Sequence, residues 1–208
     1  MDEDLTVPER VGITRRSAVT KIAAGTAAIW AAPAITTLGS RALAVPVGSP
    51  PPGEELAFHD NFDEDPVGLA VTETTYFTVE GGGNVDVIGP DPVPSGPYAG
   101  NVYNPYPGNG DYIDLDGTGS SGVISFTTKT TFVSGNYRVE YRIAGGNDGN
   151  TVTATLGSGT RTDPIAAGSA PQTLTFLATV GAPSKLSFSQ PTGDNQGAIL
   201  LEVWVYKL

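Results

Sequence analysis

Apolar and polar residues alternate with a period of two along most of the chain after residue 56. The clearest run is 137–143, where Tyr, Val, Tyr and Ile alternate with Arg, Glu and Arg; similar runs recur at 151–156 and 174–180, and the chain ends in a long apolar strand at 199–206. Successive side chains of a strand point to opposite faces, so each run predicts a half-buried β-strand. Glycine-rich turns separate the runs and no helical period intervenes. The pattern predicts an all-β, antiparallel β-sandwich of about eight to ten strands.

The first 44 residues are different and are typical of a twin-arginine export signal. They contain the pair Arg15-Arg16, an uncharged stretch at 22–40 and the small-x-small step Ala42-Leu43-Ala44. A membrane anchor is the alternative, but the stretch is rich in Ala, Gly and Thr and contains Pro33, so its transfer into hydrocarbon is weakly favourable. We therefore expect cleavage after Ala44 and a secreted product. A Pro/Gly linker at 45–55 and one domain at 56–208 follow.

The amino-acid composition argues against several kinds of site and partner. The chain has no cysteine, which excludes disulfides and thiolate metal sites. After Ala44 it carries 18 acidic and 6 basic residues. That imbalance argues against nucleic acid, whose phosphates require clustered Lys and Arg, and against an anionic membrane surface. No apolar run of membrane length follows Ala44, so no membrane contact is expected after signal cleavage.

The segment 89–110 is rich in proline and lacks the alternation. It contains Tyr98, Tyr103, Tyr106 and Asn109. Aromatic faces and amides are the groups that recognise sugars, so this loop is a candidate carbohydrate-binding segment. A plain proline-rich surface loop is the alternative, and loop composition by itself favours it.

The last strand offers another candidate, Trp204. Glu202, Trp204 and Tyr206 share one face of this strand, and the aliphatic residues share the other. Because aromatic residues are usually buried, the sequence favours a buried Trp204. If the aliphatic face is the buried one, Trp204 and Tyr206 instead form an aromatic platform beside a carboxylate, as a polysaccharide-binding face requires.

Several segments, taken in order, resemble a galactose-binding-like domain of the kind found in secreted bacterial PEP-CTERM-type proteins. They are NFDEDP (61–66), VEGGGNVDVIG (79–89), YPGNGDYIDLDGTGSSGVISF (106–126), SGNYRVEYRIAGGNDGNTVTATLG (134–157) and LSFSQPTGDNQGAILLEV (186–203). The resemblance implies a jelly-roll β-sandwich related to carbohydrate-binding modules, often with one structural calcium near the first and last strands. It implies no established activity.

The densest run of oxygen ligands is DNFDED, in which Asp60, Asp63 and Asp65 could share one Ca²⁺. Glu202 would complete the site if the fold brings the chain ends together. A solvated acidic turn is the alternative. The family's Leu-Asp-Asn-Val near the C-terminus appears here as Leu-Leu-Glu-Val at 200–203, so the aspartate it would supply is missing.

A second acidic group, Asp111, Asp114 and Asp116, precedes a Gly-Ser turn. It is a calcium loop, a catalytic carboxylate cluster, or the polar face of a strand. The twelfth position of an EF-hand pattern that starts at Asp114 is Ser125 instead of the bidentate Glu. The sequence therefore favours a polar strand face that ends in an Asp-Gly turn.

Few candidate catalytic residues follow Ala44. His59 is the single histidine, and no G-x-S-x-G motif accompanies it. A structural or surface role for His59 is the simpler interpretation. A glycoside or ester hydrolase is the less favoured alternative, and a glycosidase would need only two carboxylates. We expect a secreted, non-catalytic domain that binds a cell-envelope or environmental carbohydrate. The alternative is a structural or matrix protein that acts through protein contacts.

Overall fold

The computed structural model describes residues 52–90, 105–119, 124–191 and 197–208, and its regular elements there are all β-strands. The predicted all-β fold is therefore confirmed, with twelve strands in place of eight to ten. The strands are β1 (Glu55–Asp60), β2 (Gly68–Val71), β3 (Phe77–Glu80), β4 (Val85–Ile88), β5 (Tyr112–Asp114), β6 (Ile124–Thr128), β7 (Gly135–Ala144), β8 (Asn150–Leu156), β9 (Gly159–Ile165), β10 (Gln172–Val180), β11 (Ser187–Gln190) and β12 (Ile199–Lys207). Strands β2 to β5 have three or four residues each, too few to display an alternation in the sequence.

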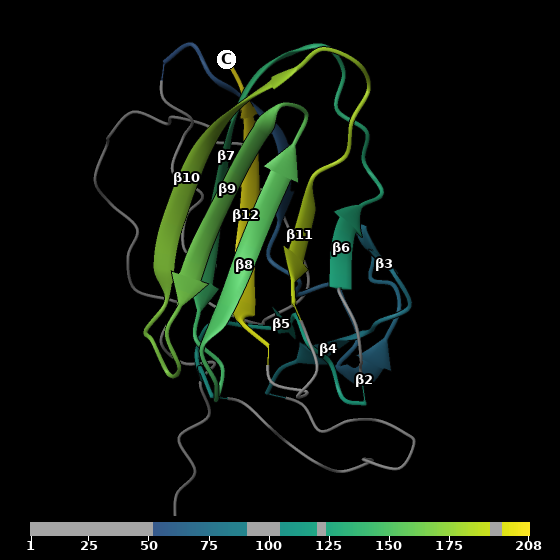
Figure 1. Ribbon diagram of the computed structural model, residues 1–208, viewed down its shortest axis with the longest axis vertical. Helices are drawn as coiled ribbons and strands as arrows, with labels where there is room; N and C mark the ends of the chain where they lie inside the picture. The colour runs from purple at the N-terminus through teal and green to yellow at the C-terminus, as the bar shows by residue number, and fades with distance from the viewer. Residues whose placement is uncertain (1–51, 91–104, 120–123, 192–196) are drawn as a thin grey trace, which may run out of the picture. The chain divides into compact units, whose positions relative to one another are not determined.

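Two antiparallel sheets form the jelly-roll sandwich (Figure 1). Sheet A has the order β10-β7-β12-β5-β4-β2, with β1 also paired to β12, and sheet B has the order β3-β6-β11-β8-β9. Strand β12 is the centre of sheet A. Strand β7 pairs along one of its edges, while β5 and β1 share the other edge end to end. The first strand and the last strand are therefore neighbours.

The core lies between the sheets and follows the predicted alternation. In β7, Tyr137, Val139, Tyr141 and Ile143 are all buried. The sheet B side contributes aromatic rings, of which Phe77 and Phe126 stack with their centroids 4.4 Å apart, and Phe188 meets Tyr141 edge to face at 5.2 Å. Each such ring contributes about 1.5 to 3 kcal/mol by its removal from water.

Within the described part of the chain, strand β10 has no second strand on its outer edge, but side chains and turns of sheet B cover that edge. Arg161 of β9 donates from Nη1 to the carbonyl of Thr175 at 2.8 Å. The amide and the hydroxyl of Ser158 both donate to the carbonyl of Thr179, at 3.0 and 3.1 Å. These contacts satisfy backbone groups that an open edge would offer to another chain.

The described residues begin within the predicted linker. Strand β1 starts at Glu55, and the Glu54 carboxylate is bound to Arg138 of β7. The twin-arginine segment and the rest of the linker lie outside the described residues. None of the described residues forms a helix long and apolar enough to cross a membrane.

A close approach of two turns depends on the absence of a side chain at Gly145. A Cβ atom there would lie 2.0 Å from the carbonyl oxygen of Ala166 and 2.6 Å from the amide nitrogen of Ser169. Because both are backbone atoms, they cannot move without displacing the turn that leads into β10.

We predict that Gly145→Ala lowers the free energy of unfolding by about 1 to 3 kcal/mol, because overpacking against the backbone forces the turn to shift. Gly181→Ala is the matched control. A Cβ at Gly181 meets nothing within 4 Å, so this variant should stay within about 0.5 kcal/mol of the wild type. Urea unfolding of the three proteins measures the difference. Equal losses in both variants would contradict the steric explanation.

Candidate functional site

The aliphatic face of β12 is the buried one, so the expectation of a buried Trp204 is wrong. Val203 and Val205 belong to the main core, whereas Glu202 and Trp204 are half-buried on the outer face of sheet A. The residues paired with Val205 and Trp204 on the neighbouring strands explain why the aliphatic face is the buried one. Val205 lies between Phe58 and Val139, while Trp204 lies between His59 and Glu140. Burial of the Trp204 face would therefore bury polar neighbours, an imidazole and a carboxylate, on both sides.

Trp204, His59 and Glu202 form one contact group on this outer face. The imidazole of His59 stacks on the indole with centroids 5.7 Å apart and planes at 15°. His59 Nε2 lies 2.8 Å from Glu202 Oε1, and the two side chains keep 26% and 14% of their surface exposed. The hydrogen bond fixes the imidazole, and the imidazole in turn limits the movement of the Trp204 ring.

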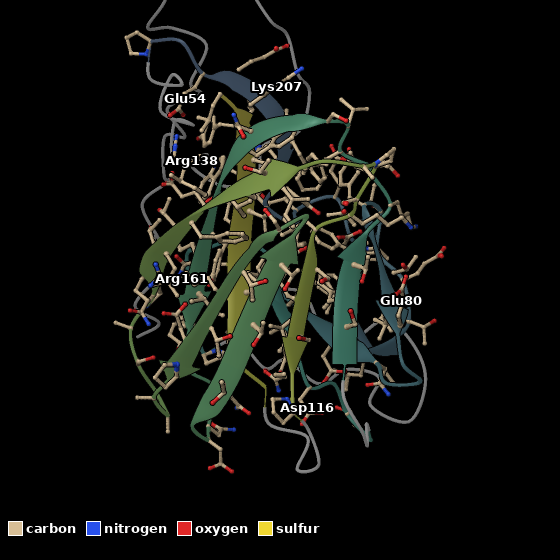
Figure 2. All side chains as sticks on the ribbon, turned by 45° about the horizontal axis from the view of Figure 1, so that its top comes forward. Glu54, Glu80, Asp116, Arg138, Arg161 and Lys207 are labelled. Carbon is tan, nitrogen blue, oxygen red and sulfur yellow. The ribbon has the colours of Figure 1, made fainter. Side chains whose placement is uncertain are left out.

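The ion pairs of Arg138 border this contact group on the β7 side. Arg138 binds Glu54, with Nη2 2.6 Å from Oε2, and also binds Glu140. Its guanidinium carbon lies 4.2 Å from the centroid of the Tyr206 ring, a cation–π contact. Figure 2 places Glu54 and Arg138 near the end of the sandwich that carries Lys207, opposite the end with Asp116.

Arg142 stands directly across from Glu202 in the β7–β12 pairing. Within the described ranges its guanidinium has no hydrogen bond or ion pair, in contrast to Arg138. The donors of Arg142 are therefore available beside Trp204. A guanidinium offers five donors in a fixed geometry, which suits recognition of a polar ligand.

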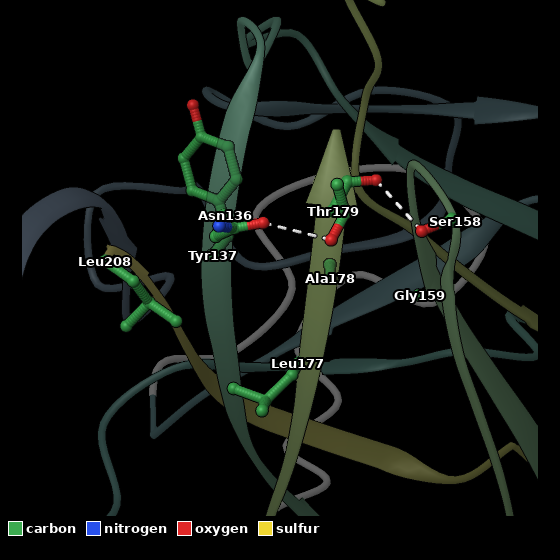
Figure 3. Close-up of a pocket in the computed structure, with 8 residues that line it drawn as sticks. All are labelled: Asn136, Tyr137, Ser158, Gly159, Leu177, Ala178, Thr179 and Leu208. Carbon is green, nitrogen blue, oxygen red and sulfur yellow. Dashed lines mark hydrogen bonds between the residues drawn. The ribbon is translucent and has the colours of Figure 1, made fainter. Parts of the chain in front are cut away.

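A pocket of about 410 Å³ lies at one end of the same sheet, where β7 and β10 meet the β8–β9 turn (Figure 3). Its apolar side chains include Leu177, which is 67% exposed, and Leu208. Its polar side includes Thr179, whose hydroxyl donates to Asn136 Oδ1 at 3.0 Å. Apolar walls with a few fixed polar groups are the usual composition of a small-molecule site.

The predicted Tyr/Asn loop site is only partly described. Tyr98 and Tyr103 lie outside the described residues. The Tyr106 hydroxyl donates to the carbonyls of Gly145 and Ser169, and its ring packs on a small cluster with Tyr112. Asn109 Nδ2 donates to the Tyr106 carbonyl at 2.9 Å. Tyr106 therefore anchors the loop beside sheet A, and Asn109 holds the loop to itself. Among the described contacts, neither side chain joins Trp204.

The predicted metal ligands separate into two places. Glu202 binds His59 on the outer face, while Asp60, opposite Val203, points to the other face of the sheet. Asp63 is exposed and accepts from the amide of Asp111 at 3.0 Å. Among the described residues, no group of three or more His, Asp or Glu side chains is arranged to hold a metal ion. The first and last strands do pair, which was the condition for Glu202 to join this site, but the alternation along each strand keeps Glu202 away from Asp60.

Two members of the acidic turn, Asp60 and Asp65, are both buried. Asp60 Oδ1 accepts from the amide of Phe62 at 2.9 Å, and Asp65 Oδ1 accepts from the amide of Thr75 at 2.6 Å. The second oxygen of each carboxyl group is buried and has no hydrogen-bond partner among the described residues. Burial, together with the charge of Asp65, raises the pKa of Asp60 to about 7.

The sequence favours a polar strand face for Asp111, Asp114 and Asp116, but two of these three side chains are buried. Ile113 and Leu115 point into the main core as expected, but Asp114 and Asp116 are buried as well. Asp114 accepts from the amides of Asp116 at 3.1 Å and Gly197 at 2.9 Å. Burial raises the pKa of Asp114 to about 7, with a further contribution from the charge of Asp86 across the strand pair.

Sequence reasoning missed Arg138, Glu140 and Arg142 as members of the outer face. Their alternation with buried residues was visible, but nothing local indicates that β7 pairs with β12. His59 was taken as a structural or surface residue, and its link to Trp204 depends on the β1–β12 pairing. Within the described ranges, the ring of His59 hydrogen-bonds only to Glu202, so no hydroxyl nucleophile is held beside it.

By sequence, the chain matches no protein-family model and no curated protein. Among solved structures it is similar to a family 6 carbohydrate-binding module of Cellvibrio mixtus lichenase 5A in complex with cellotriose, at 15% identity and a TM-score of 0.39, over 74% of this chain and 99% of the module. It is similar to a family 35 carbohydrate-binding module from Clostridium thermocellum, at 9% identity and a TM-score of 0.38, over 64% and 92%.

A third similar structure is an exo-β-1,3-galactanase from Phanerochaete chrysosporium with galactose, at 14% identity and a TM-score of 0.39 over 72% of this chain. This chain spans 29% of that enzyme's length. Likenesses this distant leave the function of the site to be judged from this chain's own side chains.

We predict that Asp114 makes the protein less stable as the pH rises. Its folded pKa is raised, so the folded state holds this proton more tightly than the unfolded state does between about pH 4 and pH 7. The stabilisation is complete below the unfolded pKa and is lost as the pH rises through about 7. Asp114→Asn keeps an oxygen that accepts the two amide hydrogen bonds but cannot titrate.

Thermal or urea unfolding between pH 4 and pH 8 should show a steeper loss for the wild type than for Asp114→Asn. The difference should be on the order of 1 to 4 kcal/mol. Parallel pH profiles for the two proteins would contradict a raised pKa at Asp114.

Proposed function

We propose that this chain is a secreted, non-catalytic carbohydrate-binding domain whose site is the outer face of sheet A around Trp204. The observation that carries the proposal is the half-exposed indole of Trp204, stacked on His59 and bordered by Glu202 and Arg142. An aromatic side chain takes the apolar side of a sugar ring, and carboxylates and guanidinium groups take its hydroxyls.

The hydrogen bonds among these side chains support a binding role. His59 is held by Glu202, and Arg138 is held by two carboxylates, so the polar groups are positioned before a ligand arrives. A preorganised site loses less conformational entropy on binding. The His59–Glu202 pair lacks an adjacent nucleophile within the described residues, which favours binding over hydrolysis.

We predict that Trp204→Ala reduces retention on immobilised polysaccharides by at least about tenfold, because truncation of a central aromatic contact typically costs 2 kcal/mol or more. A panel of cellulose, xylan, β-1,3-glucan, β-1,3-galactan and bacterial cell-wall polysaccharide, followed by titration calorimetry on any that binds, measures the loss.

Tyr76→Ala is the matched control. Tyr76 is a 37% exposed aromatic residue that packs near Phe58, away from the Trp204 face. This variant should retain wild-type binding. Equal binding by the wild type and Trp204→Ala, or no retention on any polysaccharide, would refute the proposed site.

A structural role through protein contacts is the second candidate. Leu177 and Val133, which are 67% and 57% exposed, favour it because exposed apolar side chains can join a protein interface. Concentration-dependent self-association in sedimentation experiments, together with no glycan binding, would support this candidate.

We also propose a structural cation, Ca²⁺, at Asp60 and Asp65. Two buried carboxylate oxygens without hydrogen-bond partners are the specific observation, since such groups are costly unless a partner is supplied. Calcium prefers six to eight oxygen ligands, so backbone carbonyls and water would have to provide the remainder. Asp63 and Glu202 are not members of this reduced ligand set.

Calcium should then raise the melting temperature of protein treated with EDTA. At a free concentration of a hundred times the dissociation constant, binding to the native state adds about 2.7 kcal/mol, a shift on the order of 5 °C. Magnesium should do less because it demands stricter octahedral geometry. Asp65→Asn should remove most of the shift, and Glu202→Gln should leave it. An unchanged melting temperature in millimolar calcium would exclude the site.

A further inference from the structure

The outer face of sheet A continues beyond Trp204 as a series of cross-strand rows. The registers of β10, β7, β12 and β1 define which outward side chains stand side by side. The rows are Thr175–Glu140–Trp204–His59, then Leu177–Arg138–Tyr206–Leu56, then Thr179–Asn136, where the amide of Leu208 donates to the Asn136 carbonyl.

The third row lines the pocket of Figure 3, so the pocket and the Trp204 group lie on one surface. From Trp204 to Leu208 the chain advances four residues of extended strand, about 13 Å. That distance is longer than one pyranose ring. A single sugar unit stacked on Trp204 therefore cannot also reach Leu177 or the pocket.

The side chains between Trp204 and the pocket can contact a polar polymeric ligand that lies along the strands. Leu177 provides exposed apolar surface in the middle row, where Tyr206 is buried beneath the Arg138 guanidinium, and Arg138 provides donors that its two carboxylate partners hold in place. At the far end, Asn136 uses Oδ1 to accept from Thr179, and its Nδ2 makes no hydrogen bond to the described residues, so this donor can face a ligand.

The charge of the outer face and of the whole domain indicates which class of polymer can bind. The guanidinium groups of Arg138 and Arg142 nearly balance the carboxylates of Glu54, Glu140 and Glu202 on this face. The region after Ala44, in contrast, carries 18 acidic and 6 basic residues. An anionic polymer would meet repulsion from the domain as a whole, whereas an uncharged glycan would not.

We infer that the surface from Trp204 to the Leu177 pocket binds an internal stretch of an uncharged polysaccharide, several sugar units long, in place of a single sugar or a chain end. This inference rests on the proposed carbohydrate-binding function and adds the length and the charge class of the ligand. The observation behind this inference is the outer face of sheet A itself. It has an aromatic contact, Trp204, at one end and the mixed polar and apolar Leu177 pocket at the other, with little net charge between them.

Titration calorimetry with neutral gluco-, xylo- and galacto-oligosaccharides, from monosaccharide to hexasaccharide, tests the inference. Affinity should rise at least about tenfold from disaccharide to hexasaccharide, since the second contact region adds a contribution comparable to the first. Leu177→Ser should weaken the hexasaccharide only, while Trp204→Ala should weaken every length. Val133→Ser, another exposed apolar position outside the pocket, is the matched control and should change neither.

The possible results distinguish the extended site from the proposed carbohydrate-binding function. Equal affinity for disaccharide and hexasaccharide, with binding still lost in Trp204→Ala, would overturn the extended site and leave the proposed function intact. Binding restricted to uronate-bearing oligosaccharides, or a steep loss of affinity with added salt, would overturn the uncharged ligand class. No binding at any length would overturn the proposed function together with this inference.

Discussion

Strand β12 holds the described domain together, because it is the one strand that hydrogen-bonds to β7, β5 and β1. Its alternation sends Val203 and Val205 into the core and Trp204 to the outer face. Pairing with β1 brings His59 to Trp204 and Glu202, and pairing with β7 brings the two arginines. The fold and the candidate site therefore depend on the same set of backbone hydrogen bonds.

The two faces of sheet A differ because their neighbours differ. Toward sheet B, apolar residues from β7 and β12 pack against aromatic rings such as Phe188. On the outer face, ion pairs and stacked rings satisfy charged groups that the core could not accept. A rigid sheet that presents such groups keeps them in position without a ligand, which is the property that a binding surface needs.

Buried carboxylates are the main electrostatic cost of this fold. Asp60, Asp65 and Asp114 are all largely removed from water, and burial raises the pKa of two of them toward neutrality. Asp114 is compensated by backbone amides on both sides, whereas Asp60 and Asp65 each retain a buried oxygen without a hydrogen-bond partner. The same residue type is thus satisfied by backbone amides in one place and left with an unpaired oxygen among the described residues in another.

The sequence alone determined the strand alternation, the antiparallel sandwich and the core residues of β7, because a period of two follows directly from strand geometry. It did not determine which face of β12 is buried, since the aromatic and the aliphatic face were both acceptable until the neighbours were known. Only the tertiary structure placed His59 and Glu140 beside Trp204, separated Glu202 from Asp60, and buried Asp114. Each of these outcomes depends on strand pairing between residues up to about 150 positions apart, and local composition carries no information about such pairing.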